Sequence, residues 1–152
     1  MKKKIALIVI LAILIIIQFF PASKNQSTEL LASDITKVTT VPDDVLQVLK
    51  VACYDCHSNN TVYPWYNNIQ PVAWWLNRHV EEGKEHLNFS SFGAYTAEKA
   101  AKKIRGIARE VEKGDMPLTS YTLIHRNAVL NETQKQAVIN LTKSAVIAGL
   151  AH

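Results

Sequence analysis

The residues best suited to chemistry lie together in the segment Cys53-Tyr54-Asp55-Cys56-His57. Two thiols three positions apart can reach the two vinyl groups on one edge of a porphyrin and form thioether bonds with them. A histidine directly after the second thiol then brings its imidazole to where it can bind the iron. The spacing therefore predicts one covalently attached haem c, held by Cys53, Cys56 and His57.

Three other uses of these thiols stay open at this point. A thioredoxin-type pair needs a strand before it and a helix after it, whereas a helical pattern precedes Cys53. A zinc site would add a further histidine to Cys53, Cys56 and His57, although an adjacent cysteine and histidine do not match the usual paired spacing. A disulfide between the two thiols is the plainest alternative. With two cysteines in the chain, sites made of four thiolates are excluded.

Met116 is the predicted distal ligand of the haem iron. The chain has two methionines, and Met1 begins it, which leaves Met116 in the run Gly114-Asp115-Met116-Pro117. The proline restricts the backbone on both sides, so the thioether stands on a stiff loop, as an axial ligand requires. Ligation by methionine and histidine raises the reduction potential. The plainer interpretation is a gap-filling core residue.

Three further side chains are candidates for the haem pocket. His79 shares a predicted helix face with Trp75 and Val80, so ligation by two histidines is an alternative, and a hydrogen bond to a haem propionate is the more ordinary use. We expect Trp65 and Tyr66 near the haem because their N–H and O–H groups can bond to its polar edge, although core packing would also explain them. No residue pattern in the chain indicates a catalytic group, so we expect no enzyme.

The elements that must position these residues show helical periodicity and no sustained strand-like alternation. The pattern predicts an all-α domain of about four helices, over residues 42–53, 71–83, 96–113 and 131–149. Asn131 and Gln134 form a capping-box pattern at the start of the last helix. Long loops separate the helices, which is typical of a chain that wraps a ligand.

The amino terminus indicates export. Lys2, Lys3 and Lys4 precede an apolar run from Ile5 to Phe20, which as a helix would span about 24 Å, between a signal-peptide core and a full membrane span. No convincing cleavage site follows, so residues 1–20 are predicted to form an uncleaved membrane helix. The lysines should stay cytoplasmic, which places the rest on the periplasmic side of the inner membrane.

The polar composition of residues 21–41 predicts a flexible tether, and residues 42–152 the haem-binding domain. The net charge of +4 contains the three leading lysines, so the remainder has 14 basic and 13 acidic residues. Such a balance excludes a nucleic-acid binder, which needs a field that neutralises phosphates.

The order of a helix, the Cys-x-x-Cys-His motif, loops and helices, a methionine loop and a final helix resembles a class I cytochrome c. The finer pattern is similar to a bacterial family of haem-binding domain proteins over about residues 42–150. The matching segments are the motif itself, Tyr-Pro-Trp-Tyr at 63–66, Gln-Pro-Val-Ala-Trp-Trp at 70–75, His-Val at 79–80, Leu-Asn-Phe-Ser at 87–90 and Gly-Asp-Met-Pro at 114–117. The resemblance implies covalent haem on Cys53, Cys56 and His57, while Met116 as distal ligand follows the broader cytochrome pattern.

These features together predict a membrane-tethered monohaem cytochrome that passes single electrons between redox partner proteins. A peroxidase-like enzyme or a haem-based sensor is the alternative, and both would need a distal ligand that can be displaced.

Overall fold

The structure is a computed structural model that describes residues 1–147, and its elements there are helical, which confirms the all-α prediction. The strand-like pairing among these residues is one isolated bridge between Gln26 and Asn60. The elements are α1 (Lys2–Ile16), η1 (Ile17–Phe19), α2 (Ile35–Val38), α3 (Asp43–Ala52), α4 (Tyr54–His57), η2 (Trp65–Asn68), α5 (Val72–His86), η3 (Phe89–Ala94), α6 (Ala97–Lys113), α7 (Thr119–Thr122), η4 (Arg126–Ala128) and α8 (Glu132–Ile147).

The four predicted helices are α3, α5, α6 and α8, and local signals fix their ends. Thr96 caps α6 by accepting a hydrogen bond from the Lys99 N–H, and Gly114 ends this helix at a φ of 77°, which favours glycine. The capping box forms before α8, where Asn131 and Gln134 exchange hydrogen bonds of 3.0 and 2.9 Å. The predicted end of that helix, at residues 148–149, lies outside the described residues.

The predicted loops contain short helical turns that periodicity could not show. In η3, Phe89 and Phe92 are each 1% exposed, and Asn88 caps the turn by accepting from the Ser90 N–H at 3.0 Å. Helix α5 also continues past Gly83 to His86. A turn of three to six residues is too short to repeat an apolar pattern, so its contribution to the core is invisible in the sequence alone.

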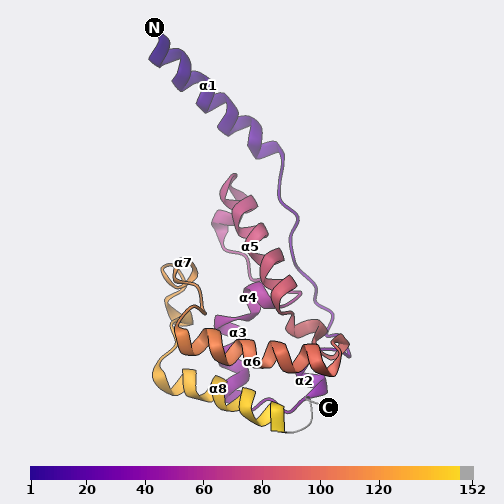
Figure 1. Ribbon diagram of the computed structural model, residues 1–152. Coiled ribbons are helices and arrows are strands. Elements are labelled where there is room, and N and C mark those ends of the chain that lie inside the picture. Colours follow the sequence, from indigo (N-terminus) through magenta and orange to yellow (C-terminus); the bar gives the residue numbers. More distant parts are fainter. Residues whose placement is uncertain (148–152) are drawn as a thin grey trace.

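The core lies where α6 and α8 pack side by side and α3 packs on α8 (Figure 1). Leu49, Ile104 and Val138 are among its buried side chains. The short helix α4 follows α3 and packs against α5 and η3, so it joins the core to α5. The Cys-x-x-Cys-His motif, which includes α4, therefore lies at the junction of these two parts of the domain.

Residues 21–41 differ from the predicted flexible tether because they pack along the domain. Ile35 is 1% exposed and belongs to the core. The Gly93 N–H donates to the Ser33 carbonyl at 2.7 Å, and Asp34 caps α2 through the Thr36 N–H. The backbone is largely irregular, as the composition predicted, but composition cannot show that its polar groups have partners in the domain.

Helix α1 extends away from the domain (Figure 1), and its apolar side chains from Ile5 to Ile16 are exposed on every side. Among the described residues, no helix combines the length and the hydropathy that a membrane-spanning helix requires.

Candidate functional site

The two thiols and the imidazole lie where α3 ends and α4 begins, and Cys53 itself is the non-helical residue between the two helices. The Cys53 N–H still bonds to the Leu49 carbonyl of α3 at 2.9 Å, and the N–H groups of Cys56 and His57 bond back to the Cys53 carbonyl at 3.2 and 2.9 Å. Both cysteines are free, half-buried thiols, so the structure has no disulfide between them. Within residues 1–147 there is also no group of three metal-binding side chains, such as a zinc site would need.

Both thiols are held in the protonated form. Burial is the main cause that raises the pKa of Cys53 to about 12, and the charge of the Cys56 thiolate adds to it. Burial is also the main cause for Cys56, whose pKa is raised to about 11 with a further contribution from the Asp55 carboxylate. A thioredoxin-type pair needs a low pKa, because the thiolate is the attacking form. Since a helix rather than a strand precedes the motif, the redox-pair alternative does not fit.

His57 is oriented by the carboxyl end of α5. Its Nδ1 lies 2.8 Å from the Gly83 carbonyl oxygen and 3.1 Å from that of Leu87. A carbonyl only accepts, so Nδ1 carries the hydrogen and Nε2 keeps its lone pair. Burial lowers the pKa of His57 despite these hydrogen bonds and keeps the ring neutral at neutral pH. A neutral imidazole with Nε2 free is the form that binds a metal.

Gly83 allows α5 to approach the motif. A Cβ at this position would lie 2.6 Å from the Cys56 carbonyl oxygen, well inside contact distance, and the Gly83 carbonyl itself bonds to His57. Only a residue without a side chain lets the helix backbone lie directly on Cys56.

Gly83→Ala should therefore push α5 away from the motif and destabilise the protein. The steric cost of overpacking is about 1–3 kcal/mol, and it opposes the gain of about 1 kcal/mol that alanine brings to a helix. Gly106→Ala in α6 is the matched control, because its Cβ would meet nothing within 4 Å and the propensity gain should appear undiminished. Denaturant unfolding of the two variants should give shifts of opposite sign; a stabilised Gly83→Ala protein would contradict this packing.

A hydrogen-bonded link that the sequence did not reveal joins the motif to α7. The Asp55 carboxylate accepts from the Val62 N–H at 3.0 Å and from the Tyr121 hydroxyl at 2.7 Å. Burial and this carboxylate raise the pKa of Tyr121, so the hydroxyl keeps its hydrogen. Asp55 occupies a position that the motif leaves variable, and Tyr121 lies in a predicted loop, so no pattern pairs them.

Met116 lies between α6 and α7, on the chain leading to Tyr121. It is half-buried, and its N–H bonds to the Glu110 carbonyl at 3.2 Å. The Asp55–Tyr121 hydrogen bond thus fixes the far end of the segment that carries the methionine. The role of Met116 as distal ligand stays a prediction.

Tyr66 lies near enough to the motif to be affected by the charge of Asp55. The pKa of Tyr66 is raised by burial and by the charge of Asp55. Trp65 is 76% exposed, and its ring meets that of Tyr66 edge-on at 5.8 Å. The contact of both residues with haem stays a prediction.

The predicted face of α5, which carries Val72 as well as Trp75, His79 and Val80, is only partly covered by the rest of the protein. Val80 is 1% exposed, whereas Val72 and Trp75 on the same predicted face are 39% and 52% exposed. His79 is half-buried; its ring stacks at a tilt on Trp75, and its Nδ1 lies 2.9 Å from the Trp75 carbonyl oxygen. An apolar face left open beside two thiols and a neutral imidazole fits a large flat apolar cofactor such as a porphyrin.

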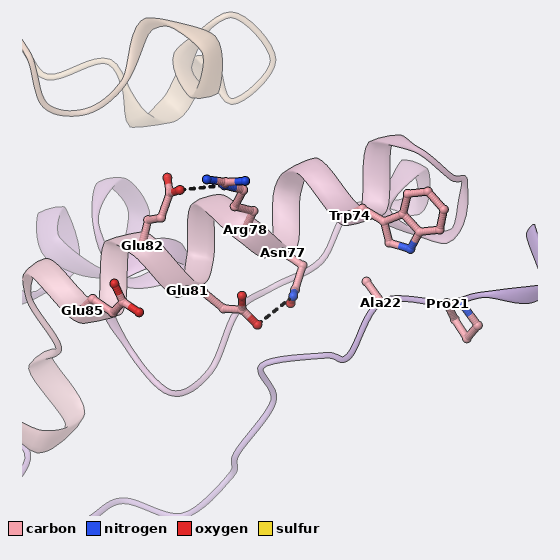
Figure 2. A pocket seen from close by; sticks show the side chains of 8 residues that line it. All are labelled: Pro21, Ala22, Trp74, Asn77, Arg78, Glu81, Glu82 and Glu85. Carbon is pink, nitrogen blue, oxygen red and sulfur yellow. Dashed lines mark hydrogen bonds and ion pairs between the residues drawn. The ribbon is translucent and has the colours of Figure 1, made fainter. Parts of the chain in front are cut away.

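A separate pocket of about 550 Å³ lies on another face of α5, between that helix and residues 21–22 (Figure 2). Glu81, Glu82 and Glu85 line it, with Glu82 paired to Arg78 at 2.8 Å. Carboxylates do not suit an apolar ring, so this pocket is not where a haem would lie.

The family comparison agrees with the site. The model of the haem-binding domain family matches residues 12–144. The protein is thus an all-helical haem-binding protein, and the chain belongs to the haem-binding domain family. No curated protein and no solved structure matches it significantly.

Proposed function

We propose that this protein is a membrane-tethered monohaem c-type cytochrome that transfers single electrons. Cys53 and Cys56 would hold one haem through thioether bonds, His57 would bind the iron from one side and Met116 from the other. The proposed domain of residues 42–152 lies on the periplasmic side of the inner membrane, where it exchanges electrons with redox partner proteins and catalyses no reaction of its own.

The observation that carries this proposal is the orientation of His57, placed directly after two free thiols. The carbonyls of Gly83 in α5 and of Leu87 just after this helix accept the Nδ1 hydrogen, which leaves Nε2 free to bind a metal. Because the two thiols form no disulfide and belong to no group of three metal-binding side chains within residues 1–147, covalent attachment is the use that their spacing supports best.

A bound haem would supply one-electron chemistry at its iron. The residues of this chain would then hold the iron six-coordinate and limit the access of water. The Asp55–Tyr121 hydrogen bond supports this role, because it fastens the segment after Met116 to the motif. A filled sixth position disfavours peroxidase-like chemistry and gas sensing, both of which need an open or displaceable site.

Met116→Ala should convert the ferric protein from low-spin to high-spin and remove the methionine–iron charge-transfer band. The midpoint potential should fall by on the order of 0.1 V, a fraction of the roughly 0.8 V that axial ligands span. Absorption spectroscopy and redox titration of the purified holoprotein measure both. Leu123→Ala is the control, since Leu123 is exposed on the same segment.

An unchanged spectrum in Met116→Ala would show that another group is the distal ligand, and His79→Ala would then test the histidine. A high-spin, five-coordinate spectrum of the unmodified protein would instead favour the sensor or the enzyme.

A further inference from the structure

The end of the apolar amino-terminal segment is fastened to the start of α5. Gln18 exchanges two hydrogen bonds with the backbone of Gln70, each 3.0 Å long. The indole N–H of Trp74 donates to the Phe20 carbonyl at 2.8 Å. The haem-binding domain is thus attached directly where the apolar segment ends, with no free linker between them.

Apolar side chains surround this attachment and are exposed. They form what we call the tryptophan surface, which consists of Phe19, Phe20, Trp65, Ile69 and Trp74, exposed by 39% to 78%. In a chain with 20% charged residues, there is no Asp, Glu, Lys or Arg between Lys4 and Lys24, and none between His57 and Arg78. Trp74 also borders the pocket lined by Glu81, Glu82 and Glu85, so the segments free of charged residues are those around Phe19, Phe20, Trp65 and Ile69. An exposed aromatic surface of this kind marks an interaction site.

The length of α1 indicates what that partner is. Its 15 residues span about 22 Å as a helix, less than the roughly 30 Å of a bilayer's hydrocarbon core. A short apolar segment draws its flanking residues toward the bilayer. Gln18 would then lie near the headgroups and would bring Gln70 and Trp74 with it.

The chemistry of the tryptophan surface suits this depth. Tryptophan prefers the membrane–water interface, where its ring is apolar and its N–H finds a polar partner. Lys24 lies at the edge of the surface, with its ammonium 3.5 Å from the Asn68 side-chain oxygen, and could reach lipid phosphates. We propose that the tryptophan surface lies in the headgroup region of the lipid bilayer, so that the haem-binding domain is held against the membrane in one orientation.

This inference rests on the membrane tethering proposed above. If the domain keeps one orientation at the membrane and does not move freely on a flexible linker, its redox partners must present their electron-exchange sites at the membrane surface.

Spin labels test the placement in the full holoprotein, reconstituted one copy per nanodisc containing anionic lipid. Because haem attachment uses both native cysteines, Ile69→Cys in the tryptophan surface adds a single free thiol for the label, at a side chain that is 45% exposed. Val129→Cys is the matched control, since Val129 is 53% exposed and lies outside the tryptophan surface. Power saturation measures the collision frequency of each label with two relaxation agents. Oxygen enters the lipid, whereas a nickel chelate stays in the water.

The ratio of oxygen to chelate collisions should be at least several-fold higher at position 69 than at position 129. Equal, water-like ratios in nanodisc-bound protein would overturn the inference and leave the tethering intact. Protein that separates from the nanodiscs would overturn both. Dipolar broadening between labels at position 69, measured in a separate preparation with two copies per disc, would place a second copy on this surface and would also overturn it.

Discussion

Replacing both Cys53 and Cys56 by serine should remove every covalent bond between the polypeptide and its haem, so that unfolding the protein releases the haem. The two thiols are the only ones in the chain, and both are free. Acidified acetone should extract all of the haem from the double variant and essentially none from the unmodified protein. A haem stain after denaturing electrophoresis should show the same contrast.

The single variants Cys53→Ser and Cys56→Ser are the controls, because each keeps one thiol for one thioether bond. Haem that resists extraction should remain in both, in reduced yield. Haem retained by the denatured double variant would mean that the attachment does not use these thiols.

Ile35→Ala should cost about 2–5 kcal/mol of stability, the range for truncating a buried isoleucine to alanine. Ile35 is 1% exposed and lies in the same core cluster as Leu49 and Phe92. The change removes apolar contacts and leaves a cavity that the surrounding helices can fill only partly. Chemical denaturation of the holoprotein, followed by circular dichroism, measures the loss.

Leu30→Ala is the matched control in the same segment, because Leu30 is 59% exposed. It should change the stability by less than about 0.5 kcal/mol. Equal, small effects of the two substitutions would mean that residues 21–41 form a free tether after all.

The main helices could be predicted because their signals are local, and the role proposed for the Cys-x-x-Cys-His motif likewise follows from local spacing. The capping box of Asn131 and Gln134 and the glycine at position 114 each act within a few residues of chain. The same holds for Cys53, Cys56 and His57, whose chemistry depends on their spacing.

Features that depend on distant segments could not be predicted. Gly83 is needed because α5 lies against Cys56, and this contact joins residues 27 positions apart. Asp55 meets Tyr121 across 66 positions. Neither residue type indicates its partner, so only the folded chain shows how the motif is held.

The partly covered face of α5 shows a further limit of prediction from sequence periodicity. Its helical spacing correctly predicted a helix, but periodicity cannot show whether protein or cofactor covers an apolar stripe. Val72 and Trp75 are exposed in the polypeptide, and an adjacent haem would account for their apolar character.

The mass of the unmodified protein, purified from a host that matures c-type cytochromes and then denatured, tests covalent attachment most directly. The proposal predicts the polypeptide mass plus that of one haem. A mass equal to that of the polypeptide alone, from material that bound haem before denaturation, would contradict it.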